Sequence, residues 1–256
     1  NEQAVMDFVK ANDIHVIENC AAYTAVDKAE ENIEFCTKLN ADAVGYLAKA
    51  AEANQAEFIQ ISTDYVFDGT AHTPYRETEP TCPNSVYGST KLAGEQNALT
   101  LCSRSMVIRT AWLYSTFGNN FVKTMLRLGQ EREALGVVFD QIGSPTYAAD
   151  LAMAIFAAIE APEWHAGVYH CTNEGVCSWY DFTHEIFARA KALLSTDAAQ
   201  RIAQCNLRPI LSCEYQYQTP RPHFSVLNKS KIKQTFDIAI PHWTEALQVC
   251  LEKLLS

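Results

Sequence analysis

Residues 57–69 read EFIQISTDYVFDG, an apolar run that ends in hydroxyl and acidic side chains. The run is rich in Ile and Phe and gives way to Asp and Gly, which predicts a short buried strand followed by a loop. Ser62, Thr63 and Asp64 would then lie at the carboxyl end of a strand, where open α/β sheets bind their ligands. The alternative is an ordinary strand-to-loop turn, in which these side chains bond to the nearby backbone.

Short apolar runs alternate with longer helical patterns along most of the chain, which predicts βαβ units around a parallel sheet. The expected strands cover 15–23, 57–63, 106–114, 135–141 and 167–173. The expected helices cover 31–53, 84–101, 119–130, 147–161, 178–194 and the C-terminal stretch from Pro241. The alternation ends after residue 195, where no clean period follows. The predicted fold class is α/β, a Rossmann-type doubly wound parallel sheet with a smaller mixed α/β substrate-binding lobe.

We expect this fold to divide into two parts. Residues 1–112, with roughly 135–172, would form the dinucleotide-binding domain, and 113–134 with 173–256 would form most of the substrate-binding lobe. The loops 20–28, 62–69 and 112–118 each follow a predicted strand. Because the carboxyl ends of parallel strands meet at one edge of a sheet, these loops are the predicted site.

Composition excludes several classes of function. The chain has 256 residues, a formal net charge of -10 and no cluster of Lys or Arg, so nucleic acid is not an expected partner. No apolar run reaches membrane-spanning length and no signal peptide is visible, so we expect a cytoplasmic protein. The nine cysteines contain no CxxC pair, which predicts buried, reduced thiols rather than a zinc site.

Tyr87 and Lys91 lie four residues apart in SVYGSTKLAGE (85–95) and therefore share one face of the predicted helix. A lysine charge beside a tyrosine hydroxyl would favour tyrosinate and lower the tyrosine pKa towards the range of a general acid. Such an acid suits protonation of a carbonyl oxygen during hydride transfer. The pair alone is a weak signal, since any long helix can carry it by chance.

The surrounding segments resemble those of dTDP-4-dehydrorhamnose reductases, members of the extended short-chain dehydrogenase/reductase superfamily. The resemblance covers nearly the whole chain and rests on six segments in the family's order: NCAAYTAVDKAE (19–30), STDYVFDG (62–69), VYGSTKLAGE (86–95), IRTAWLY (108–114), DQIGSPTYAADLA (140–152) and TPRPHFSVL (219–227). Related sugar-nucleotide enzymes share the second and third segments. The first segment and the Trp of the fourth are closer to the reductases.

The resemblance implies a role for particular residues. Tyr87 resembles the general acid, Lys91 the residue that binds the nicotinamide ribose and tunes that acid, and Thr63 their hydroxyl partner. The loop along the cofactor would contain Ala21, Ala22 and Tyr23. The implied substrate contacts, besides Thr63 and Tyr87, are Val26, Asp64, Tyr65, Trp112 and Arg221. A core aromatic is the alternative for Trp112, and a surface salt bridge is the alternative for Arg221.

Tyr65 separates this chain from related dehydratases. The 4,6-dehydratases that resemble it carry an Asp-Glu pair after the Thr, and their Glu removes a proton beside the carbonyl. Here the pair is Asp64-Tyr65, so dehydration is disfavoured. Epimerases that keep NAD bound are not excluded by this test.

A dinucleotide fold also needs a Gly-rich turn after its first strand, where backbone amides meet the pyrophosphate. None of the ten glycines precedes Gly45, and neither G-x-G-x-x-G nor G-x-x-G-x-x-G occurs. By resemblance the first βαβ unit, about 30 residues or more, is absent from this sequence. We expect it to belong to a longer chain or a separately numbered segment, and loss of the cofactor site is the alternative.

The leading functional prediction is NADPH- or NADH-dependent reduction of the 4-keto group of dTDP-4-dehydro-L-rhamnose to dTDP-L-rhamnose, for cell-surface polysaccharide. The substrate is a small-molecule nucleotide sugar. Another sugar-nucleotide reductase or epimerase, or a non-catalytic regulatory subunit, is the alternative. The resemblance also implies a homodimer and Mg²⁺, although no metal ligands can be identified in the sequence.

Overall fold

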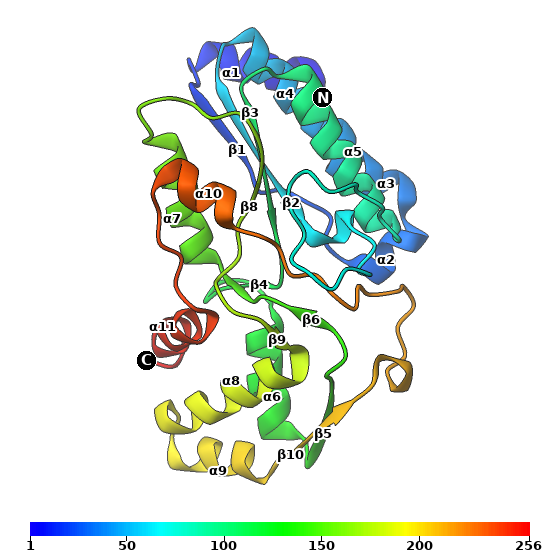
Figure 1. The fold of residues 1–256 in the computed structure, drawn as a ribbon, viewed down its shortest axis with the longest axis vertical. Coiled ribbons are helices and arrows are strands. Elements are labelled where there is room, and N and C mark those ends of the chain that lie inside the picture. Colours follow the sequence, from blue (N-terminus) through cyan, green and yellow to red (C-terminus); the bar gives the residue numbers. More distant parts are fainter.

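The computed structural model describes residues 1–256, and a parallel sheet forms its upper lobe (Figure 1). The strands follow the order β1-β2-β3-β8, and every neighbouring pair is parallel. Their bounds are β1 Val16–Asn19, β2 Glu57–Thr63, β3 Ser105–Thr110 and β8 Gly167–His170. The α/β class with a parallel sheet is confirmed, and β2 matches the predicted strand 57–63.

Helices cover both faces of this sheet (Figure 1). One face carries α1 Glu2–Ala11, α4 Ala43–Ala53 and α5 Val86–Leu101; the other carries α7 Ala148–Ile159 and α10 Ser230–Phe236. Alternate residues of a strand point to opposite faces. Phe58 accordingly packs against α4 and α5, whereas Ile59 packs against α7. Both faces are buried, which explains the nearly continuous apolar strands.

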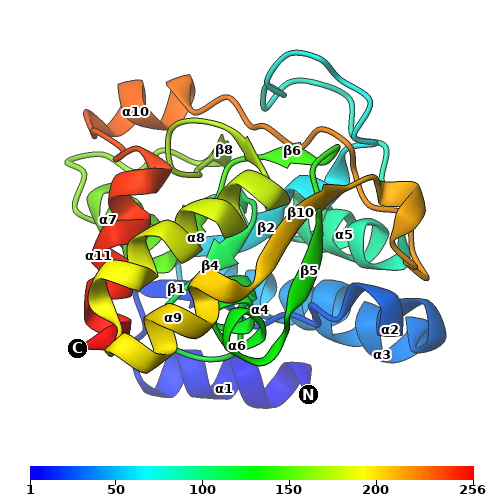
Figure 2. The same cartoon turned by 90° about the horizontal axis from the view of Figure 1, so that it is seen from below.

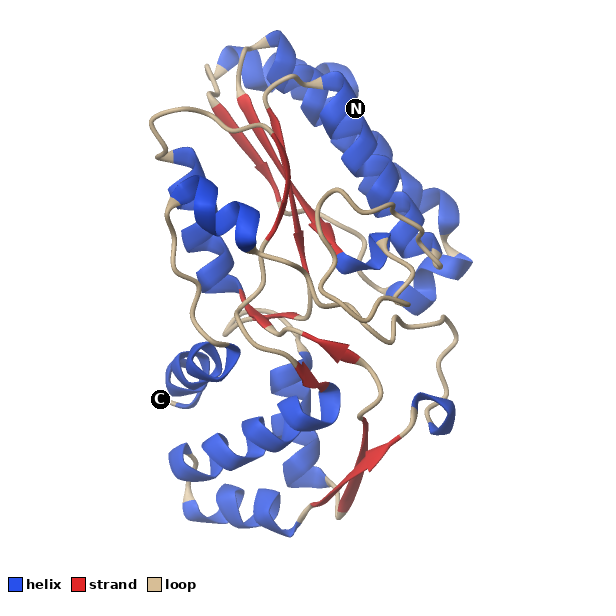
Figure 3. Ribbon diagram, viewed as in Figure 1, coloured by secondary structure: helices blue, strands red, loops and turns tan.

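The second lobe lies at the other end of the molecule and contains helices with short two-stranded sheets (Figures 2 and 3). Its helices are α6 Phe121–Glu131, α8 Trp179–Leu193, α9 Thr196–Gln204 and α11 Trp243–Leu255. Its strand pairs are β4 Leu113–Tyr114 with β7 Thr146–Tyr147, β5 Ala134–Val138 with β10 Asn206–Ile210, and β6 Ile142–Gly143 with β9 Cys177–Ser178. Aromatic and aliphatic side chains from these helices form its core.

The predicted helix 31–53 is present from residue 33, without interruption, as α3 Ile33–Thr37, a π-helical segment η1 Lys38–Asp42, and α4. The short helix α2 Val26–Glu31 precedes it. The π-helical turn was not predicted, and such turns within α-helices are frequent at functional sites. Two short 3₁₀ turns, η2 Asp64–Val66 and η3 Ser212–Glu214, complete the elements.

The predicted strand 106–114 is broken between β3 and β4. Trp112 has φ of 49°, in the left-handed region that a strand does not tolerate. Helix α9 and strand β10 occupy residues 196–210, where the sequence showed no clean period. The prediction of a helix with Ser178 as its N-cap is confirmed by a capping box with Asp181.

Two elements lie outside the halves to which the sequence assigned them. Strand β5 falls in the stretch 135–172 but pairs with β10, away from the main sheet. Helix α10 falls in 173–256, yet Ile232 packs into the core beneath the main sheet. The exact division of the chain into a dinucleotide-binding and a substrate-binding part remains a proposal.

All nine cysteines are free thiols, and six of them are buried. Cys20, Cys82 and Cys213 are exposed. The expected burial of Cys20 is therefore wrong, because it lies just beyond the end of β1, outside the core. None of the helices combines the length and the apolar character that a membrane crossing requires.

Candidate functional site

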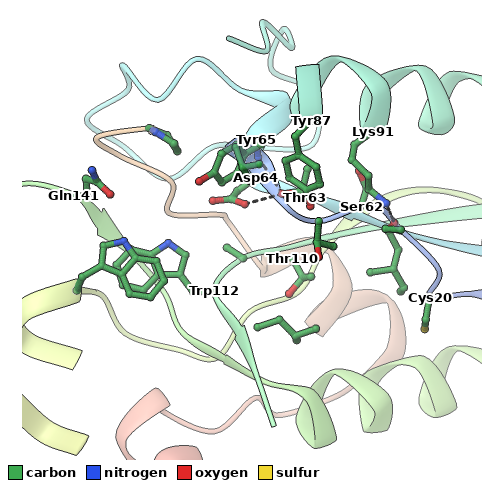
Figure 4. A pocket seen from close by; sticks show the side chains of 18 residues that line it. Cys20, Ser62, Thr63, Asp64, Tyr65, Tyr87, Lys91, Thr110, Trp112 and Gln141 are labelled. Atoms are coloured by element: carbon green, nitrogen blue, oxygen red, sulfur yellow. Dashed lines mark hydrogen bonds between the residues drawn. The ribbon is translucent and has the colours of Figure 1, made fainter. Parts of the chain in front are cut away.

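A cavity of about 400 Å³ opens at the carboxyl ends of β1, β2 and β3 (Figure 4). The loops after these three strands supply much of its lining, as the sequence predicted. Helix α5 adds Tyr87 and Lys91, and the second lobe adds Gln141 and Trp179. The cavity therefore lies where the two lobes meet.

Helix α5 begins directly beneath the loop that follows β2. Ser85 caps it by accepting a hydrogen bond from the Gly88 amide (3.1 Å), which places Tyr87 in the first turn. A Cβ at Gly88 would lie 2.3 Å from the Tyr65 carbonyl oxygen, so only glycine permits this approach. The close packing holds Tyr87 and Lys91 against the end of β2.

Lys91 is buried at the inner end of the cavity. Its Nζ donates to the Ile61 carbonyl oxygen over 2.6 Å. Burial lowers the Lys91 pKa to about 8, and the charge of Glu95, one turn further along α5, opposes that shift. Both the charged and the neutral forms of Lys91 are thus accessible near neutral pH.

The Tyr87 hydroxyl differs from the sequence prediction. Burial raises the pKa of Tyr87 to about 12, and the neighbouring Thr63 hydroxyl only partly offsets that rise. The predicted lowering by Lys91 is therefore wrong for this structure: desolvation dominates, and the Lys91 ammonium bonds to a backbone carbonyl. Tyr87 consequently holds its proton at neutral pH.

Thr63 and Asp64 bond to one another at the end of β2. The Thr63 hydroxyl donates to Asp64 Oδ1 (2.9 Å) and accepts from the Tyr65 amide (3.3 Å) (Figure 4). The local turn bonding that was the alternative to a site is thus present, and both residues also line the cavity. The other carboxylate oxygen, Asp64 Oδ2, is buried without a partner, and burial raises the Asp64 pKa to about 6.

Tyr65 stands where the dehydratases resembling this chain carry their Glu. Its ring contacts Tyr87 edge to face, with 5.3 Å between the ring centroids. Burial raises the Tyr65 pKa above its usual range, so this residue supplies no base at neutral pH.

Trp112 lines the cavity but is not free on both faces. Its indole stacks on Trp179 at a centroid distance of 3.5 Å and an angle of 9°. Its ring also lies so close to Gly143 that a Cβ there would come within 2.6 Å. The indole is therefore fixed by two elements of the second lobe, α8 and β6. Val26 lines the same cavity, as predicted.

The predicted cofactor loop is held by two asparagines. Asn19 accepts from the Ala21 amide (3.2 Å), while Asn40 accepts from the Tyr23 amide (2.8 Å) and donates to its carbonyl oxygen (3.1 Å). Ala22 lines the cavity, whereas Ala21 and Tyr23 do not. Asn40 lies in the π-helical segment, which brings its side chain to this loop.

Arg221 lies outside the main cavity. It lines an adjacent, more apolar cavity of about 280 Å³, which shares Tyr65, Gln141 and Trp179 with the first. Its guanidinium pairs with Asp27 over 2.7 Å. The salt bridge considered as the alternative for Arg221 is therefore present, although only 15% of the arginine side chain is exposed.

A buried polar network lies behind the cavity and was not predicted. Ser62 donates to Glu95, and Arg109 donates to both oxygens of that carboxylate, with Nη2–Oε2 at 2.7 Å. Arg109 Nη1 is 3.4 Å from His170 Nε2, and burial lowers the His170 pKa to about 3. The network ties β2, β3, β8 and α5 together beneath Thr63 and Lys91.

Outside the predicted loops, sequence reasoning also missed several lining residues, among them Gln141 and Trp179. Gln141 stands in the quoted segment 140–152, and that position was its available signal. Trp179 follows the predicted N-cap Ser178, but nothing local indicates that it reaches Trp112. For the implied Mg²⁺, no group of three or more His, Cys, Asp or Glu side chains is placed to hold a metal ion.

Comparison with known proteins identifies the family of the chain. The RmlD substrate binding domain family matches residues 1–256. The dTDP-4-dehydrorhamnose reductase of Escherichia coli K12 is 40% identical over 260 residues, covering 100% of this chain and 85% of that protein. A reductase of that name from Bacillus anthracis, solved in complex with NADP, superposes with a TM-score of 0.90 at 37% identity, covering 99% of this chain and 85% of that one. Another, from Clostridium acetobutylicum, gives 0.90 at 41% identity and covers 100% and 86%. The chain belongs to the RmlD substrate binding domain family.

Proposed function

We propose that the protein is an NADPH-dependent oxidoreductase that reduces the 4-keto group of dTDP-4-dehydro-L-rhamnose to give dTDP-L-rhamnose. The observation that carries the proposal is the meeting of Thr63, Tyr87 and Lys91 at one cavity at the carboxyl end of the sheet. Relatives named dTDP-4-dehydrorhamnose reductase, whose alignments cover the whole chain, support the same activity.

The residues present fit the nicotinamide ribose of the cofactor. An ammonium group has three N–H donors, and one of those of Lys91 is bonded to Ile61. The other donors are available to ribose hydroxyls at the cavity wall. Ala22, a small residue in the same wall, leaves room beside it. When bound, NADPH supplies the hydride that adds to the carbonyl carbon.

Tyr87 would supply the proton. Tyr87 is protonated at neutral pH and can transfer its proton to the C4 oxygen as charge develops there. The Lys91 charge would stabilise the tyrosinate that remains. The Thr63 hydroxyl, which bonds to Asp64 in this structure, would turn to donate to the sugar oxygen beside the tyrosine. One hydride and one proton then convert the carbonyl to a hydroxyl.

The rest of the nucleotide sugar has a place in the second cavity. Its apolar wall includes Phe121, Val137 and Tyr217, which suits a planar base, and Arg221 brings a positive charge. Tyr65 and Trp179 border both cavities, so one ligand can span them. We propose Trp112, Val26, Asp64 and Tyr65 as contacts of the sugar, and Arg221 as a contact of the diphosphate.

The test is product analysis with full-length protein. We expect dTDP-4-dehydro-L-rhamnose to oxidise one equivalent of NADPH, followed by absorbance, and to yield dTDP-L-rhamnose. A different reduced sugar would place the protein among other sugar-nucleotide reductases. Binding of both ligands without oxidation would instead indicate a regulatory subunit and contradict the proposal.

A further inference from the structure

A segment of the second lobe, residues 215–224, crosses to the upper lobe beside α2; we call it the strap. In Figure 1 it is the orange segment that passes between the lobes near α2. At its far end the Phe224 amide donates to the Gly69 carbonyl oxygen (3.1 Å), and the Ile142 amide donates to the His223 carbonyl oxygen (2.7 Å). The middle of the strap needs a separate anchor.

Asp27 is that anchor, although it lies 192 residues before Thr219 and 194 residues before Arg221 in the chain. One carboxylate oxygen accepts from the Thr219 amide (3.1 Å), and the other accepts from Arg221 Nη2 (2.7 Å). Asp27 directly follows Val26, which lines the main cavity. A single side chain of α2 therefore holds both the backbone and the guanidinium of the strap.

The salt bridge to Asp27 uses only one of the two terminal nitrogens of Arg221. Arg221 Nη1 is buried and has no hydrogen-bond partner. The guanidinium also lies over the Tyr217 ring, 5.4 Å from its centroid, which restrains its plane from a second side. A buried, unpaired N–H of a charged group is costly unless a ligand completes it. Since Arg221 lines the apolar cavity, that ligand would be an anion bound there.

From this geometry we infer that Asp27 is a positioning residue for substrate binding, which anchors the strap and aims Arg221 Nη1 at the diphosphate of the nucleotide sugar. The inference rests on the proposed function, which places a nucleotide diphosphate in the second cavity. Asp27 does not touch the ligand. It acts by restricting an otherwise flexible arginine to one orientation, so that less entropy is lost when a phosphate oxygen binds.

The experiment is a double-mutant cycle on dTDP binding, measured by calorimetry with the full-length protein, its Asp27→Asn and Arg221→Ala variants and the double variant. We expect each single change to weaken dTDP binding about tenfold, equivalent to about 1.4 kcal/mol. The double variant should bind no more weakly than Arg221→Ala, because Asn keeps an oxygen that can accept from the Thr219 amide and the change therefore removes only the bond to the arginine. Glu31→Gln, an equal charge change at an exposed site on the same helix, should bind as the unchanged chain does.

Four outcomes would overturn the inference. Tighter dTDP binding by Asp27→Asn would mean that Asp27 competes with the phosphate for Arg221. Unchanged binding, or losses that add in the double variant, would mean that it does not act through Arg221. If Arg221→Ala binds normally while the chain still binds dTDP, the inference fails and the proposed function stands. If the unchanged chain does not bind dTDP at all, the proposed function fails as well.

Discussion

At the scale of single residues, burial sets the chemistry of the site more than neighbouring charges do. Tyr87 and Asp64 are both pushed towards their protonated forms by desolvation, although Lys91 lies on the same helix face as Tyr87. A proton held at neutral pH suits an acid that must give it up only during hydride transfer. The spacing in the sequence singled out Tyr87 but could not reveal how far it is buried.

Asp64 gives a stability prediction with a defined sign. Its pKa is about 6 in the folded protein and about 4 in an unfolded chain. The folded state therefore binds the proton more tightly, and the ionised carboxylate costs stability above pH 6. Asp64→Asn should raise the free energy of unfolding at pH 7, by at most about 3 kcal/mol. The gain should vanish as the pH falls from 6 to 4, which urea unfolding across this range would measure.

For a matched variant, Asp68→Asn, we expect the opposite change in stability at pH 7. Asp68 accepts hydrogen bonds from the Thr70 amide and the Tyr75 hydroxyl, and these lower its pKa. Asp68→Asn should thus lose stability at pH 7. Equal behaviour of the two variants would contradict the assignment of Asp64 as a desolvated, unpaired carboxylate. Asp64→Asn should also reduce turnover, since Asp64 is proposed to contact the sugar.

At the scale of elements, helix α5 depends on a glycine, Gly94, at its contact with the π-helical segment. Gly94 packs so closely on η1 that a Cβ would lie 2.1 Å from the Asn40 carbonyl oxygen. Asn40 in turn donates to Thr90, and Thr90 donates to the Tyr87 carbonyl oxygen. This contact therefore joins the predicted cofactor loop to α5, the helix that carries Tyr87.

Gly94→Ala should destabilise the protein by about 1–3 kcal/mol, because backbone must move to admit the methyl group. The matched control is Gly45→Ala on α4, where the nearest atoms lie 3.5 Å from the new Cβ. That change should be neutral or stabilising by up to about 1 kcal/mol through helix propensity. Thermal unfolding measures both, and similar melting temperatures for the two variants would contradict the proposed packing.

The elements that the sequence predicted are those with a strong local signal. Strand β2 has a short apolar run and helix α8 has a clear N-cap, and their predicted positions are confirmed. Helix α9 was missed although Ser195 and Asp197 mark a possible start, because only Ile202 of its residues is buried. The break at Trp112 was missed since no glycine or proline marks its positive φ.

At the scale of the whole molecule, the site is assembled by contacts that no local pattern reveals. Trp112 follows β3 and Trp179 begins α8, yet their stacked rings join the two lobes at the cavity. Asp27 and Arg221 form a salt bridge although 194 residues separate them in the sequence. The alternation of strands and helices predicted the sheet, and the resemblance supplied the candidates. Neither could place β5 beside β10, because two-stranded sheets this short leave no distinctive period.

The central claim is that Tyr87 donates the proton in an NADPH-dependent reduction. Its most direct test compares full-length protein with its Tyr87→Phe variant in NADPH oxidation by dTDP-4-dehydro-L-rhamnose. Tyr46→Phe, on α4 and outside the cavity, is the control. We predict a rate at least about 100-fold lower for Tyr87→Phe, with dTDP binding within about twofold and the control unaffected. A Tyr87→Phe rate close to that of the unchanged protein would contradict the account.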